Sequence, residues 1–295
     1  MLLNKRISVW DFIKIIKFDL LYIVTFSLLI GWVSHEKYLE SIVIPLPIIS
    51  TMGTIVSLLL AFRTAQSYDR WWEARIVWGG IVNDSRTLIR QLIQFLPDSS
   101  QQEINSFAER QIIWNYALSE SLRRVPFSHK VQHYLDKNNI HDHNIPNTIL
   151  SAHSLQLKRL AEQQQITEFR QVQIDETLVR LCDSMGKCER IKNTVFPSSY
   201  SVLLHFMICV FIVMLPFCLS DNLMYAKIAL TIGIPVIFIA IEKTAIMMQD
   251  PFENSPMDTP MTTLSQTIEM NILQQIGEKN VSKPVPPAPE EYYIM

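Results

Sequence analysis

The chain has 295 residues, a formal net charge of −2 at pH 7 and a mean hydropathy of +0.15. The near-neutral charge argues against a nucleic-acid-binding protein, which would carry a basic patch. Four cysteines without a CxxC pair argue against a disulfide framework and indicate a reducing compartment for the soluble part. The mean hydropathy lies between that of soluble proteins and that of a bundle of spanning helices, so we expect one part of the chain to lie in the membrane and another part to be soluble.

The N-terminal segment predicts an interfacial helix followed by a membrane span. In residues 1–19, apolar side chains recur at helical spacing beside Lys14 and Lys17, which is typical of an amphipathic helix at a membrane surface. Residues 20–34 are uncharged and predict a short first span. A cleaved signal peptide is the alternative, and we reject it because residues 31–35 (GWVSH) are no small-residue cleavage site.

Residues 41–75 are the stretch around which the chain is organised. They begin as an uncharged run that ends at Phe62 and continue, without Gly or Pro after Gly53, into a segment rich in Arg and Trp. Pro45 and Pro47 fit a helix start, where a missing N–H costs little. From Pro47 to Phe62 the uncharged helix would rise about 24 Å along its axis, which is somewhat short of a hydrocarbon core of ~30 Å. We therefore expect one helix that crosses the membrane and continues into water.

One face of this helix allows two interpretations. Thr54, Leu58 and Phe62 recur at i, i+4 and i+8, so they follow one side of the helix. Small residues between positions 50 and 57 permit close packing of membrane helices. The same face could instead line a pore, in which Leu or Phe rings form an apolar constriction.

The middle of the chain predicts a soluble helical domain, because no further apolar run follows Phe62 for about 130 residues. Helical periodicity extends over residues 83–96, 101–125, 128–139, 147–165 and 168–194. A third apolar segment covers residues 193–220 and contains Pro216, which is expected to kink or end it. Residues 228–241 predict the fourth span, and the proline-rich tail holds one amphipathic helix at residues 263–276.

Basic residues determine the predicted orientation. The N-terminal flank and the segment after the second span are rich in Lys and Arg, whereas each short loop carries only one basic residue, Lys37 or Lys227. Both termini are then cytoplasmic. The expected domains are an amphipathic N-terminal helix (1–19), the first and second transmembrane helices (20–62), a cytosolic helical domain (63–194), the third and fourth transmembrane helices (195–242) and a cytosolic C-terminal segment (243–295).

A set of motifs in the right order resembles the bestrophin family in its bacterial form. The matching stretches are 60–64 (LAFRT), 68–75 (YDRWWEAR), 188–191 (CERI), 193–197 (NTVFP), 215–217 (LPF), 241–242 (IE) and 250–254 (DPFEN). The resemblance covers about residues 5–275. The motifs are specific to the family when they are taken together, and any one of them alone would not be.

This resemblance implies an all-α membrane protein of four transmembrane helices with a large cytosolic helical domain, assembled as a homopentamer around one pore in the bacterial inner (plasma) membrane. The family's neck falls on Thr54, Leu58 and Phe62, and many relatives carry a bulky apolar residue where this chain has Thr54. The family's cytosolic aperture falls near Val172, with Ile174 as the second choice. The implied partners are other copies of the chain, membrane lipid and permeant monovalent ions.

The resemblance leaves charge selectivity open between two readings. The bacterial branch is associated with monovalent cations such as sodium, which we take as the expectation, and a chloride or other anion channel is the alternative. Arg63 is expected to pair with Asp69 or Glu73 rather than face the pore. Glu253 and Asp258 are too few to form a calcium site like that of the animal relatives, so a helix-capping turn is expected there.

Other constellations are weaker. His129 and His133 lie one helical turn apart, and His141 and His143 follow in the next loop, so these four are weak candidates for a metal site. The sequence contains no HExxH, nucleophile elbow or phosphate-binding loop, so we expect neither an enzyme nor a cofactor. A membrane-anchored metal-binding or scaffold protein is the remaining alternative.

Overall fold

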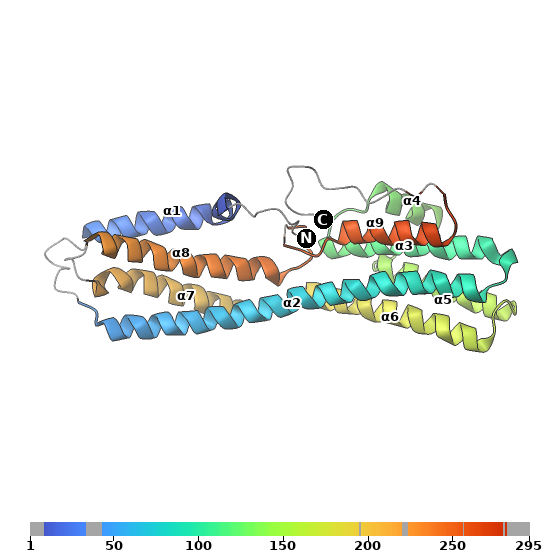
Figure 1. Ribbon diagram of the computed structural model, residues 1–295, viewed down its shortest axis with the longest axis horizontal. Helices are drawn as coiled ribbons and strands as arrows, with labels where there is room; N and C mark the ends of the chain where they lie inside the picture. Colours follow the sequence, from blue (N-terminus) through green and yellow to red (C-terminus); the bar gives the residue numbers. More distant parts are fainter. Residues whose placement is uncertain are drawn as a thin grey trace. The chain divides into compact units, whose positions relative to one another are not determined.

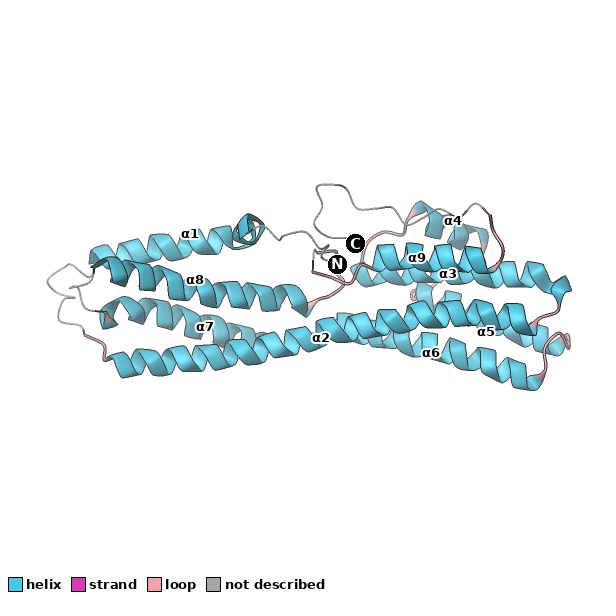
Figure 2. Cartoon of the chain, in the orientation of Figure 1, coloured by secondary structure: helices cyan, strands magenta, loops and turns pink. Residues whose placement is uncertain are grey.

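The computed structural model describes residues 9–33, 43–194, 196–219, 224–255, 257–279 and 281, and its regular elements are all helices (Figures 1 and 2). The all-helical prediction is therefore confirmed for these residues. The elements in chain order are α1 (Val9–Val33), α2 (Leu46–Phe95), η1 (Asp98–Ser100), α3 (Gln101–Arg123), α4 (His129–Lys137), α5 (Ile145–Glu162), α6 (Glu168–Asn193), α7 (Ser198–Met214), η2 (Leu215–Cys218), α8 (Met224–Gln249) and α9 (Met261–Gln275).

The chain divides into two compact units. The span unit comprises the described residues within 5–70 and 195–249, and the bundle unit comprises the described residues within 71–194 and 250–295. The helix α2 contributes to both, because the division falls within it.

The span unit is built from α1, the first half of α2, α7 and α8. The helix α8 packs against both α1 and α7, and these helices run alongside one another (Figure 1). The helix α2 joins them through an apolar cluster in which Val56 and Leu60 meet side chains of α7. A side chain added at Gly53 would place its Cβ 3.2 Å from the ring of Phe211, so glycine permits the close approach of α2 and α7.

Three helices in the described residues are long and apolar enough to cross a membrane. They are α2, the segment Ser198–Cys218 and the segment Lys227–Gln249, which correspond to the second, third and fourth predicted spans. The helix α7 ends just before Pro216, where the backbone tightens into the 3-10 turn η2, as the proline predicts. The first span stays a prediction, although α1 continues without a break from the expected interfacial segment to Val33.

The bundle unit has α3 near its centre, in contact with α4, α5, α6 and α9. Its core contains large side chains that are fully buried, among them Trp78 of α2, Phe107 and Trp114 of α3, and Phe252 before α9. The helices begin and end within a few residues of the predicted bounds; α3, for example, stops where Arg124 takes a left-handed backbone with φ 56°.

Candidate pore-lining site

The face of α2 that carries Thr54, Leu58 and Phe62 is free of contact over most of its surface within the span unit. Leu58 is 66% exposed and Phe62 is 54% exposed, and Thr54 is exposed as well. Val56 and Leu60, on the opposite side of the helix, are 0% and 2% exposed. Exposed and buried positions alternate with the helical period, so Thr54, Leu58 and Phe62 share one uncovered face of α2, and their place at a neck stays a prediction.

The hydroxyl groups on this part of α2 bind to the helix backbone. The Oγ1 atom of Thr54 donates to the carbonyl oxygen of Ser50 at 2.8 Å, and Ser57 donates to Gly53 at 2.8 Å. Each hydroxyl hydrogen is used within the helix, so only the oxygen lone pairs face outward. This face is therefore polar in places but carries no charge.

A groove of about 730 Å³ runs beside this face, between α2, α7, η2 and α8. Its lining is mainly apolar and includes Phe211, Leu215 and Phe238, with Ser50, Gly53 and Thr54 on the α2 side. The start of α2 lies close to η2, because Ile44 donates its backbone N–H to the carbonyl of Phe217 at 3.1 Å. The first turn of α2 contains no acidic residue, so the partial positive charge of the helix N-terminus is not offset there.

A buried ion pair lies directly after the exposed face. Nη1 of Arg63 is 3.0 Å from Oε1 of Glu242, and the side chains are only 4% and 1% exposed. The expectation that Arg63 pairs with Asp69 or Glu73 was wrong, because α8 brings Glu242 to this level of α2. Glu73 instead pairs with Arg190 of α6, at 2.5 Å.

Two side chains of α7 extend this contact. Nδ1 of His205 lies 3.0 Å from the same Glu242 oxygen, and Tyr200 donates its hydroxyl to the carbonyl of Leu59 at 2.7 Å. The ring of Tyr200 also lies 5.8 Å from the ring of Phe62, between centroids. Sequence reasoning missed both contacts, although an ionisable residue such as His205 within an apolar run was a usable signal.

The two expected aperture positions differ sharply in burial. Val172 on α6 is 58% exposed, whereas Ile174 is 0% exposed and belongs to the core of the bundle unit. Ile174 cannot line an opening without leaving that core, so Val172 is the position we retain. Around Val172 lies a shallow groove whose charged lining residues are Glu168, Asp175, Glu176 and Arg180.

The turn before α9 uses its carboxylates internally. Asp258 accepts hydrogen bonds from the backbone N–H of Ser255 at 2.8 Å and from its hydroxyl at 2.5 Å. Asp250 accepts from the N–H of Phe252 at 3.1 Å and contacts Nζ of Lys192 at 2.6 Å. Burial raises the pKa of Asp258, while its bonds to Ser255 oppose the shift. The turn does not cap α9 with a side chain, since the N-cap is Pro260.

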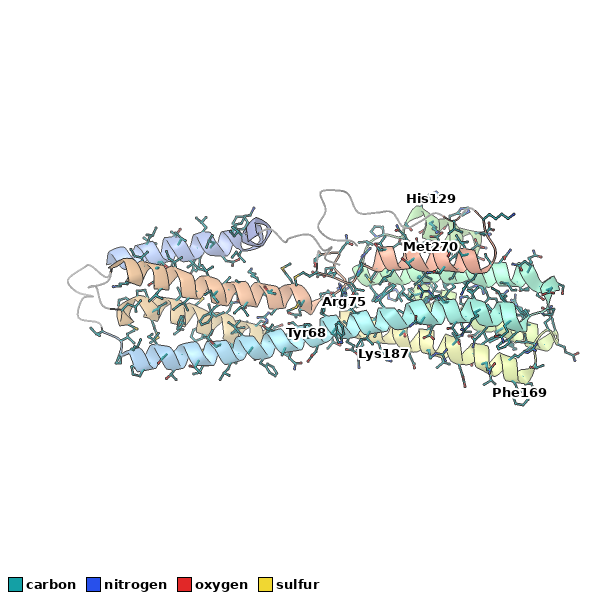
Figure 3. All side chains as sticks on the ribbon, in the orientation of Figure 1. Tyr68, Arg75, His129, Phe169, Lys187 and Met270 are labelled. Atoms are coloured by element: carbon teal, nitrogen blue, oxygen red, sulfur yellow. The ribbon has the colours of Figure 1, made fainter. Side chains whose placement is uncertain are left out.

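The histidines do not converge in the part of the chain that the structure describes. His129 and His133 stack with ring centroids 6.3 Å apart, and His129 lies on the outside of the bundle unit (Figure 3). His153 is fully buried against Phe107, and Nη1 of Arg110 is 3.5 Å from its Nδ1. Among the described residues, no group of three or more His, Cys, Asp or Glu side chains could hold a metal.

Residues 8–274 match the family described as Bacterial/Fungal Bestrophin protein. The chain belongs to the bacterial and fungal bestrophin family. This confirms the resemblance that the motifs of the sequence indicated, and the match includes both candidate regions, the exposed face of α2 and the groove of α6.

Individual relatives agree with this assignment. The chain is 28% identical over 299 residues to the voltage-dependent anion channel-forming protein YneE of Escherichia coli (strain K12), covering 98% of this chain and 96% of that protein. It is 26% identical over 237 residues to the voltage-dependent anion channel-forming protein RSc3414 of Ralstonia nicotianae, covering 79% and 78%. A crystal structure of a bacterial bestrophin homolog from Klebsiella pneumoniae matches with a TM-score of 0.82 at 26% identity, covering 90% and 100%.

Proposed function

We propose that the protein is an ion channel of the bacterial inner membrane, formed by five copies of the chain around a pore lined by α2. In this assembly Thr54, Leu58 and Phe62 form the neck and Val172 lies at a cytosolic aperture. The observation that carries the proposal is the uncovered α2 face, which holds two large apolar side chains on a helix of membrane-spanning length. One chain has too few spans to enclose a pore, so several copies must each contribute one such face.

The proposed placement follows the charge distribution of the sequence. Four spans cross the membrane, both termini are cytoplasmic, and the bundle unit lies in the cytosol, where Lys and Arg flank the spans. Membrane lipid would cover apolar side chains of the spans that no other subunit covers. The family assignment weighs against the membrane-anchored metal-binding or scaffold alternative.

We propose anions such as chloride as the permeant ions. The names of the relatives refer to anion channels, and no such support exists for the sodium preference expected from the sequence. The start of α2 gives a physical reason, because five helix N-termini without acidic residues in the first turn would gather positive potential at one mouth. Glu36 and Glu40, whose negative charges in the sequence after the first predicted span would favour cations, lie outside the described residues.

A preference for cations remains the second candidate because of one observation on α6. Val172 shares its groove with Glu168, Asp175 and Glu176, whereas the arginine of this groove, Arg180, is paired with Asp84 at 2.9 Å. A ring of such carboxylates would attract cations at the aperture.

Two measurements test the proposal. The mass of the purified complex in detergent should correspond to five chains, and the reconstituted complex should carry current across a planar bilayer. A monomer of about 34 kDa by mass, with no current, would contradict the channel. An oligomer that binds metal and carries no current would favour the metal-binding alternative.

A further inference from the structure

His205 is an ionisable side chain placed between membrane helices. It belongs to the apolar helix α7, its side chain is 60% exposed, and its Nδ1 lies 3.0 Å from Oε1 of Glu242. Arg63 approaches the same oxygen at 3.0 Å from α2. One buried carboxylate oxygen of α8 is therefore shared by basic side chains from two other helices.

Protonation of His205 would change the charge of this cluster. A carboxylate only accepts hydrogen bonds, so Nδ1 of His205 carries the hydrogen that points to Glu242, and Nε2 is the atom that takes up a further proton. Histidine is the side chain that ordinarily changes charge between about pH 5 and pH 8. Arg63 and Glu242 cancel each other, so the added proton gives the cluster a net charge of about +1.

The surroundings offer little to offset this charge. In the described residues, α2 contributes Arg63, α8 contributes Glu242, and α7 itself contributes the hydroxyl of Tyr200, whose hydrogen goes to the carbonyl of Leu59. The helix α1 contributes Asp19, which is engaged by Lys243 of α8 at 3.3 Å. Among the described residues, the carboxylate that contacts His205 is that of Glu242, and it is already paired with Arg63.

The new charge would lie beside the proposed neck. Leu204 and Ile208, which flank His205 on α7, pack against Val56 and Leu60 of α2 in one buried cluster. That segment of α2 presents the neck residues on its other side. Apolar membrane surroundings screen a charge less than water does, so a charge on His205 at this level can influence ions in the pore.

We propose that His205 is a proton-controlled specificity determinant of the channel, an inference that rests on the proposed function. Protonation adds one positive charge per subunit at the level of the neck. This charge attracts anions and repels cations, so acidification raises chloride current and lowers any cation current.

The proposal is tested by bilayer currents of the wild type and of His205→Gln at about pH 7.5 and about pH 5.5. The wild type should gain about twofold or more in chloride current on acidification, and His205→Gln should lose this gain. His129→Gln, which changes an exposed histidine of the bundle unit, should keep it. An equal response in the wild type and His205→Gln would overturn the proposal.

Labelled histidine tests the same site without any current. The ring signals of carbon-labelled histidine in detergent should include one that shifts between about pH 7.5 and about pH 5.5 in the wild type and is missing from His205→Gln. A His205 signal that does not move over this range would overturn the proton site. A His205 signal that moves, without any current, would support the proton site and contradict the channel. A cation current that falls on acidification would support the added charge and contradict anion selectivity.

Discussion

Arg63 and Glu242 are separated by 179 positions in the sequence, and their side chains form a buried ion pair with a separation of 3.0 Å. The pair fastens α2 to α8 one residue after Phe62, at the end of the exposed α2 face. Burial of two charges is tolerated only when they remain paired, so each partner depends on the other. The ring of Phe196 lies 5.4 Å from the Arg63 guanidinium and extends the contact to the segment before α7.

Removing Glu242 alone should therefore destabilise the span unit more than removing both partners. Glu242→Met leaves Arg63 buried without an anion, at a cost of about 3–5 kcal/mol, whereas Arg63→Met together with Glu242→Met should cost less. Thermal unfolding in detergent measures both. Lys158→Met, which breaks the exposed pair with Glu162, is the control and should change stability by less than about 1 kcal/mol. A double variant as unstable as Glu242→Met would contradict the dependence of the two charges.

Shortening the apolar side chains of the neck should increase conduction. Leu58→Ala and Phe62→Ala each remove bulk from the exposed face of α2, so the constriction becomes wider and easier to wet. Single-channel recording should find conductance or open probability raised by about twofold or more. Val202→Ala, at an exposed apolar position of α7, should leave the current unchanged. If both neck variants assemble normally and conduct like the wild type, these residues do not line the constriction.

Removal of calcium should leave the protein unaffected. Calcium binds six to eight oxygen ligands, several of them anionic, but Asp250 and Asp258 already bind groups of the protein. Chelation should therefore change neither the bilayer current nor the thermal midpoint. Steep activation by micromolar calcium would show that a calcium site forms after all.

Acid should destabilise the bundle unit through His153. Burial, together with the positive charge of Arg110, lowers the pKa of His153 well below its ordinary value. The unfolded chain binds a proton at His153 below about pH 6.5, and the folded chain does not, so stability is present above that pH and is lost as the pH falls. The loss can reach ~1.4 kcal/mol per pH unit.

Thermal unfolding of the wild type and of His153→Gln between about pH 7 and about pH 5 measures this effect. The glutamine variant should lose part of the acid sensitivity, and the exposed control His133→Gln should keep it. Equal slopes for the wild type and His153→Gln would place the acid sensitivity elsewhere.

Local helix geometry made the α2 face predictable. Thr54, Leu58 and Phe62 share a side of the helix because of their spacing alone, so no knowledge of other helices was needed. The partner of Arg63 was not predictable in this way, since Glu242 reaches it only through the packing of α8 beside α2. Nearby candidates in the sequence were preferred to a distant carboxylate, and that preference was wrong.

The sequence motifs did not decide which residue of α6 lies at the aperture. The family resemblance left both Val172 and Ile174 possible, although residues two positions apart on a helix point about 200° apart and cannot both face the aperture. The buried face of α6 runs through Ile174, Leu178, Leu181, Met185 and Cys188. This apolar pattern at helical spacing was visible in the sequence, and it assigns Ile174 to the core and leaves Val172 outside it.

The reversal potential of the reconstituted wild type under a tenfold NaCl gradient tests the central claim, that this bestrophin conducts anions, most directly. Our account predicts a reversal potential displaced toward the chloride equilibrium potential, with a larger displacement at acid pH. A reversal potential displaced toward the sodium equilibrium potential would contradict anion conduction and would favour the carboxylates around Val172 as the selecting charges.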